Sequence, residues 1–145
     1  MKTRICLLLS IGFILPTVAC KDGHMSQVPA EKSKLKKATD VFWALDEMGY
    51  VVTKARPEPS RHGCIPNEYL AQKEIAEFRI SVYHCGDYQR TKSIVENPKT
   101  RLVDSFLRNH HDGGILQRGP LEIIIRKTRG EKQAVQDLLD ALEAL

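Results

Sequence analysis

The sequence lacks the short motifs that most often mark an enzyme. It contains no glycine-rich phosphate loop, no Gly-x-Ser-x-Gly nucleophile elbow and no His-Glu-x-x-His metal motif. It also has no Cys-x-x-Cys pair, the spacing common in zinc and redox sites. These absences favour a non-enzymatic protein, and they give no reason to expect a cofactor.

The chain also lacks a long apolar run and a strong excess of one charge. Its longest apolar run, from Ile5 to Ala19, is shorter than the roughly 20 residues that a bilayer-spanning helix needs. The formal net charge is +4, and two of the basic residues, Lys2 and Arg4, lie at the N-terminus, just before the apolar run. The only dense basic cluster lies at residues 32–37. Without a basic face or stripe elsewhere, we expect no nucleic-acid partner.

Residues 1–19 have the layout of a secretory signal peptide. Lys2 and Arg4 form a positive head, the next eleven residues are almost continuously apolar, and Pro16 ends the run. Small residues then stand one and three positions before Cys20. This order predicts that residues 1–19 are removed on export and that the protein works outside the cytoplasm.

The segment Leu15-Pro16-Thr17-Val18-Ala19-Cys20 resembles the lipobox of bacterial lipoproteins. It departs from the commonest form at Thr17, where leucine is usual, and Thr-Val-Ala also suits ordinary signal peptidase. The resemblance implies that Cys20 is acylated and becomes the first mature residue. It therefore implies a membrane partner through a lipid anchor and a location in the cell envelope, facing the periplasm or the exterior, with residues 20–32 as a flexible tether.

The four cysteines of the chain fit this interpretation. Cys6 leaves with the signal peptide, and acylation of Cys20 leaves Cys64 and Cys85 as a pair that an oxidising compartment would join. A zinc site formed by these cysteines with His62 and His84 is the alternative. It is disfavoured because adjacent residues on a strand, such as His84 and Cys85, point to opposite faces.

The remaining residues, 33–145, predict a single small α+β domain. Apolar periodicity and turn residues indicate, in order, a helix from about residue 33, a strand at 50–54, a loop at 56–67, a strand at 74–85, helices at 88–96 and from 97, a turn at 112–114, strands at 115–117 and 121–127, and a helix at 131–145. We expect a three- to four-stranded antiparallel or mixed sheet with helices packed on one face, as a variant of the ferredoxin-like sandwich. In the helix from residue 97, Leu102, Val103, Phe106 and Leu107 form the predicted apolar stripe.

Three groups of residues are candidates for function. The loop at 56–67 carries Arg56, Arg61 and His62, and a disulfide at Cys64 would make it a constrained protein-binding edge. His110 and His111 are an alternative metal site, although histidines at a helix end are also explained by the helix dipole. Glu68, Glu74 and Glu77 are carboxylates of the kind a hydrolase pairs, but their spacing does not distinguish them from surface residues.

The function expected from the sequence is an envelope lipoprotein with a non-enzymatic binding domain, of the immunity, inhibitor or accessory-subunit type, with a protein partner in the envelope. A metal-binding or metal-sensing periplasmic domain and a small envelope hydrolase are the alternatives.

Overall fold

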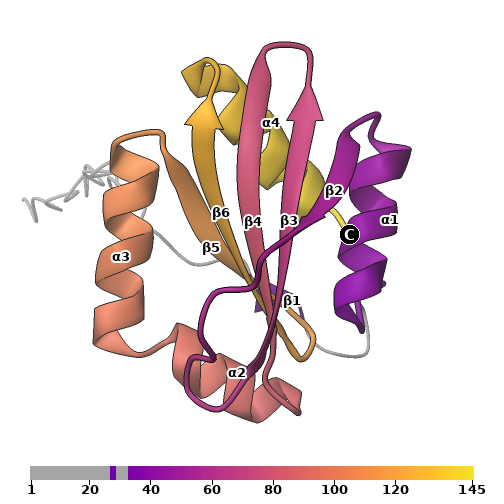
Figure 1. Ribbon diagram of the computed structural model, residues 1–145. Helices are drawn as coiled ribbons and strands as arrows, with labels where there is room; N and C mark the ends of the chain where they lie inside the picture. The colour runs from indigo at the N-terminus through magenta and orange to yellow at the C-terminus, as the bar shows by residue number, and fades with distance from the viewer. Residues whose placement is uncertain (1–26, 29–32) are drawn as a thin grey trace, which may run out of the picture.

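The computed structural model describes residues 27–28 and 33–145 (Figure 1). The predicted signal peptide, Cys20 and most of the tether lie outside the described residues. The elements follow one another as β1 (Gln27–Val28), α1 (Ala38–Glu47), β2 (Val51–Ala55), β3 (Ile65–Lys73), β4 (Ala76–His84), α2 (Tyr88–Val95), α3 (Pro98–Asn109), β5 (Gly113–Arg118), β6 (Leu121–Arg129) and α4 (Lys132–Glu143). The α+β class is as expected.

The strands form one sheet in the order β1-β5-β6-β4-β3-β2. All neighbouring strands from β2 to β6 run antiparallel, and the two-residue β1 adds a parallel pair at the β5 edge. The expected count of three to four strands is therefore too low, since five antiparallel strands are present in the part of the chain described. The element order also differs from the β-α-β-β-α-β pattern of a ferredoxin-like sandwich.

One face of the sheet holds the main core beneath α1 and α4. The apolar stripes predicted for these helices are buried, with Val41 and Leu45 of α1 and Leu138 and Leu142 of α4 almost fully excluded from solvent. They pack on every second residue of the central strands, including Ile80. Figure 1 shows α4 behind the sheet.

The opposite face is also partly covered by helices, which corrects the expectation that all helices pack on one face. Leu107 of α3 and Ile94 of α2 pack with Ile115 and Ile124, whose side chains alternate with those of the main core. α3 and α1 lie at opposite edges of the sheet (Figure 1). On this face Ser81, Tyr83 and Glu122 are buried, whereas Arg79 and Arg126 are partly exposed.

β3 was not predicted from the sequence, and its first three residues, 65–67, lie in the loop expected at 56–67, where Pro66 indicated a break. Proline cannot donate to a strand ladder and is usual at sheet edges. β2 ends at Ala55, which pairs with Glu68, so the first residues of β3 have a described neighbour only in β4. Pro66, opposite Tyr83, therefore occupies a locally unpaired edge of an otherwise central strand.

The turn expected at 112–114 is also different in the structure. Gly113 and Gly114 are buried and already belong to β5. Gly113 has φ of +150°, and a Cβ there would collide with the backbone carbonyl of Ile125 on β6. The glycine therefore allows β5 and β6 to approach at the start of their pairing.

The predicted apolar stripe of α3 is only partly buried. The helix begins where it was expected, with Asn97 capping it through its side chain and Pro98 as its first residue. Leu107 faces the core, whereas Leu102, Val103 and Phe106 are exposed. None of the helices within residues 33–145 is long and apolar enough to cross a bilayer.

Candidate functional site: the tethered loop and the polar groups beneath it

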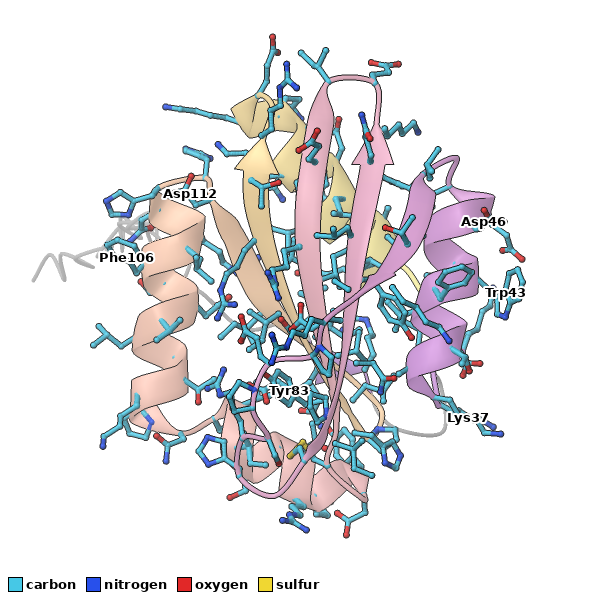
Figure 2. The ribbon with its side chains drawn as sticks, in the orientation of Figure 1. Lys37, Trp43, Asp46, Tyr83, Phe106 and Asp112 are labelled. Carbon is cyan, nitrogen blue, oxygen red and sulfur yellow. A yellow bond between two sulfur atoms is a disulfide. The ribbon has the colours of Figure 1, made fainter. Side chains whose placement is uncertain are left out.

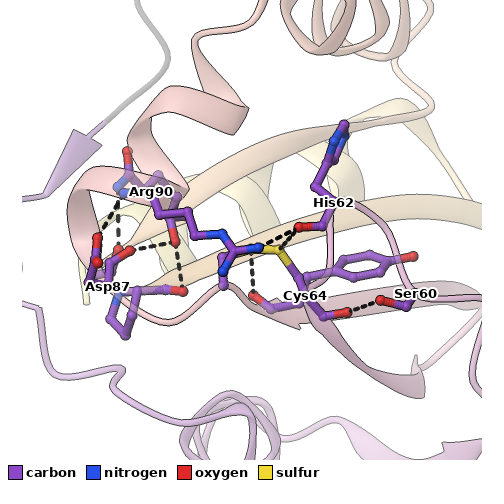
Figure 3. The surroundings of a disulfide bond; sticks show 11 residues. Ser60, His62, Cys64, Asp87 and Arg90 are labelled. Atoms are coloured by element: carbon purple, nitrogen blue, oxygen red, sulfur yellow. Dashed lines mark hydrogen bonds between the residues drawn. A yellow bond between two sulfur atoms is a disulfide. The ribbon is translucent and has the colours of Figure 1, made fainter.

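A disulfide joins Cys64 to Cys85, as the cysteine count predicted (Figure 3). Cys64 directly precedes β3 and Cys85 directly follows β4, and the neighbouring residues Ile65 and His84 are paired, so the bond closes the end of this strand pair. Both cysteines are buried, and their Cα atoms are 4.4 Å apart. The sulfurs are bonded to each other, so the zinc site considered from the sequence is not formed.

The disulfide holds the end of the loop at residues 56–64, here called the tethered loop. Further hydrogen bonds fasten its backbone to neighbouring elements. Arg90 of α2 donates from Nη2 to the carbonyl of His62 at 2.8 Å, and Arg79 of β4 donates from Nη2 to the carbonyl of Arg56 at 3.3 Å. The loop is thus held at both ends against the face of the sheet that α4 leaves free (Figure 1).

The three predicted binding residues of the tethered loop differ in their surroundings. Arg56 and His62 have exposed side chains. Arg61 is half-buried, and its guanidinium carbon lies 5.7 Å from the centre of the Tyr83 ring, in position for a cation–π contact. Arg56 and His62 are therefore available to a partner, whereas Arg61 also holds the loop on the sheet.

Polar side chains from the central strands gather beneath the tethered loop. Ser81 and Tyr83 of β4 and Glu122 of β6 point to this face, opposite to the core residues that alternate with them. Glu68 of β3 is paired with Ser81. All four are buried. Charged and polar groups are thus enclosed between the sheet and the loop.

Glu122 is a buried carboxyl whose pKa is raised. It is fully buried, and neither carboxylate oxygen has a hydrogen-bond partner. Burial raises the pKa of its carboxyl above the usual 4.5, while the positive charge of Arg61 and of His62 opposes the rise. Burial thus stabilises the protonated form of Glu122 relative to that of an exposed carboxyl, because the carboxylate would lose its hydration without gaining a donor.

The remaining charges form a network that includes the loop. Arg79 donates from Nε to Oε2 of Glu68 at 3.0 Å, and Arg126 donates from Nη1 to Oε1 of Glu58 at 3.1 Å. Arg79 Nε also lies 3.9 Å from Glu58 Oε1, and the Tyr83 hydroxyl donates to Glu58 Oε2 at 3.5 Å. Glu58, which belongs to the tethered loop, thus links the loop to two strands.

The carboxylates considered for hydrolysis are not brought together as a catalytic pair. Glu68 is buried and bound to Arg79, and its other oxygen, Oε1, has no hydrogen-bond partner. Glu74 is exposed at the turn between β3 and β4, and Glu77 lies 3.9 Å from Arg129. Glu68 thus serves the ionic network beneath the loop.

The alternative metal site at the end of α3 does not assemble further ligands. The His110 ring lies against the Phe106 ring, with centroids 4.2 Å apart, and its Nδ1 is 2.8 Å from the Phe106 carbonyl. His111 is exposed. Within residues 27–28 and 33–145, no group of three or more His, Cys, Asp and Glu side chains is arranged to hold a metal ion.

Sequence reasoning missed Glu122, Tyr83 and Glu58. One signal for Glu122 was present, since it is the only charged residue in the apolar run from Leu121 to Ile125. A lone charge in such a run is expected to be buried with its strand. The position of Glu58 had no signal, because it depends on how the loop folds back.

Comparison with known proteins gives no further assignment. No family model matches this chain, and no curated protein or solved structure is significantly similar to it.

Proposed function

We propose that this protein is an envelope lipoprotein, anchored through acylated Cys20, whose residues 33–145 form a non-enzymatic domain that binds another protein of the envelope. The observation that carries the proposal is the buried disulfide between Cys64 and Cys85. Such bonds persist in oxidising compartments. The bond agrees with the export signal in residues 1–19 and leaves Cys20 as the one mature cysteine available for a lipid.

The distribution of side chains supports binding more than catalysis. Glu68 and Glu122, the buried carboxylates of the central sheet, lie beneath the tethered loop, where a substrate has no access to them. Arg56, His62 and the neighbouring Ile65 are exposed. Because the disulfide and the charge network already hold this backbone, a partner that contacts these side chains has little loop entropy to remove.

The anchor is tested by expressing the full chain, with its leader, in a bacterial host. Intact-mass measurement of the purified protein should show a chain that begins at Cys20 and carries acyl groups, and the protein should enter the detergent phase on phase separation. Cys20→Ala should abolish acylation. A full-length, unacylated protein that retains Met1 would contradict the proposal, and a cleaved but unacylated chain would indicate simple secretion.

The binding surface is tested by cross-linking and recovery of partners from envelope membranes. Arg56→Ala combined with His62→Ala should reduce recovery of the specific partner at least tenfold, the effect of losing about 1.4 kcal/mol of binding free energy. Lys54→Ala is the matched control, because Lys54 is an exposed cation on the adjoining strand β2. Equal recovery of the partner with the wild type and with the Arg56→Ala, His62→Ala variant would exclude the tethered loop as the binding edge.

A further inference from the structure

The outer surface of α3 is apolar where a surface helix is normally polar. Leu102, Val103 and Phe106 are 73%, 43% and 58% exposed, and they lie on neighbouring turns of the helix. The His110 ring extends this surface by lying against Phe106. Contiguous exposed apolar groups of this kind usually mark a contact with a partner or a membrane.

The fold fixes α3 so that these side chains cannot turn inward. Asp104, on the inner side of the helix, accepts the backbone N–H of Ile115 on β5 at 2.6 Å. It also accepts from Nε of Arg108 at 3.0 and 3.1 Å. Rotating α3 to bury Phe106 would break these bonds and expose Leu107. The apolar surface is therefore a permanent feature of the folded domain.

The charge beside the apolar surface is positive. Lys99 and Arg101 are exposed on α3, and the only acidic residue of the helix, Asp104, is buried. Asp112, which follows the helix and is half-exposed, is paired with Lys127 at 3.4 Å. Glu96 is the nearest exposed carboxylate in the preceding sequence, and it lies 3.9 Å from Lys92. An apolar stripe flanked by cations fits the interface of an anionic bilayer, where apolar groups enter the acyl boundary and cations meet the head groups.

The place where the N-terminal part of the chain joins the sheet also favours a membrane as the partner of this apolar surface. β1 (Gln27–Val28) pairs with Gln117 and Arg118 of β5, the strand to which α3 is fastened. Cys20 precedes Gln27 by seven residues. A chain of that length spans at most about 25 Å. A lipid on Cys20 would thus lie within that distance of the β5 edge, and β5 is the strand against which α3 packs.

We propose that α3 lies on the anionic surface of the membrane that holds the lipid anchor, with Leu102, Val103 and Phe106 inserted at the interface. The proposal rests on the lipid anchor of the proposed function. It orients the domain, because α1 and the β2 edge then face away from the membrane (Figure 1). A partner can approach the domain from that free side.

The test uses tryptophan fluorescence in the acylated protein, reconstituted into phosphatidylethanolamine–phosphatidylglycerol vesicles with brominated acyl chains. Trp43, the only tryptophan, lies on α1 and is 60% exposed, so it provides a built-in control. Figure 2 shows Trp43 and Phe106 at opposite sides of the molecule. The wild-type emission should stay unquenched. Phe106→Trp combined with Trp43→Phe should give a blue-shifted emission that the brominated lipids quench.

Charge variants test the same contact without a new fluorophore. Leu102→Glu combined with Phe106→Glu should detach α3 from the vesicle surface while the lipid anchor stays inserted. The anchored domain should then become more accessible to protease. Ile75→Glu is the matched control, because Ile75 is also apolar and 61% exposed but lies at the turn between β3 and β4. It should leave the orientation unchanged.

The outcomes separate this inference from the anchor itself. An acylated, vesicle-bound protein whose tryptophan at position 106 is not quenched overturns the α3 contact and leaves the lipoprotein proposal intact. A chain without acyl groups overturns both. A dimer in solution that Leu102→Glu abolishes would assign the apolar surface to a second copy and would also overturn the membrane contact.

Discussion

Glu122 on β6 and Tyr83 on β4 stand directly opposite each other, and both side chains are fully buried. Side chains that face each other on adjacent strands interact strongly when water is excluded. Burial and the nearby carboxyls of Glu58, Glu68 and Glu122 raise the pKa of Tyr83, while Arg61 lowers it. The pair thus places two acidic groups beneath the tethered loop, where the neutral form of each is favoured.

The first prediction concerns pH and Glu122. Its pKa is raised in the folded protein, so the unfolded chain releases this proton at a lower pH than the folded chain. Below its usual value of 4.5, Glu122 is protonated in both states and adds no penalty. As pH rises from there through the folded pKa, the free energy of unfolding falls by about 1.4 kcal/mol per pH unit. Glu122→Gln should remove this loss.

Urea unfolding of both proteins, followed from about pH 4 to pH 8, measures the effect. The Gln variant should be the more stable one at neutral pH, and the difference should disappear in acid. Glu77→Gln is the control, because Glu77 is partly exposed on the same sheet face. Parallel stability curves for wild type and Glu122→Gln would show that Glu122 is ionised in the folded protein.

The second prediction concerns the disulfide. Cys64 and Cys85 are 21 positions apart, and opening a closed loop of this size should cost about 3 kcal/mol of stability. Cys64→Ser combined with Cys85→Ser should lower the midpoint of thermal unfolding and make the tethered loop sensitive to protease first. Reductant should produce the same shift in the wild type and none in the double variant. A reductant effect in the double variant would refute this assignment.

The third prediction concerns the attachment of α3 through Asp104. Asp104→Ala removes the acceptor for the buried N–H of Ile115, and such a loss costs about 1–3 kcal/mol. Asp104→Asn keeps an acceptor oxygen and should be closer to wild type. Amide hydrogen exchange should show faster exchange at Ile115 in the Ala variant. Asp46→Ala, at an exposed position of α1, should leave stability and exchange unchanged.

The fourth prediction compares two glycines with positive φ. Gly113→Ala should strongly destabilise the fold, because the added methyl group collides with the Ile125 carbonyl and forces β5 away from β6. Gly86→Ala meets no atom within 4 Å, so only its φ of +100° opposes the change. The loss of stability in denaturant unfolding should be clearly larger at Gly113. Equal losses would mean that backbone conformation alone decides both positions.

Several features of the fold could be predicted because they depend on local pattern. The buried face of α4, including Leu138 and Leu142, follows from helical periodicity, and β4 follows from its strict alternation. The cap of α3 by Asn97 was also visible in the sequence. The strands at Pro66 and Gly113 could not be predicted in this way, because proline and glycine normally break a strand. Pro66 lies where β3 has no partner on one side, and Gly113 lies where β5 and β6 approach closely.

The candidate site was predicted in part. Constraint of the loop by the disulfide followed from the cysteine count and the predicted compartment, but the buried polar residues beneath the loop did not. Glu68, Ser81 and Glu122 lie on three different strands, and their proximity depends on the register of β3, β4 and β6. No spacing along the chain encodes that register.

The sequence alone predicts an export signal, a lipid on Cys20 and the pairing of Cys64 with Cys85, since each prediction depends on local order or on a count. The structure confirms the pairing. Tertiary structure decided which side of α3 is exposed. Helical periodicity places Leu102, Phe106 and Leu107 on one broad stripe. The side that faces β5 is fixed by the hydrogen bond that Ile115 N–H donates to Asp104 and by the packing of Leu107. The rest of the stripe remains at the surface because a helix at a sheet edge has one side to bury.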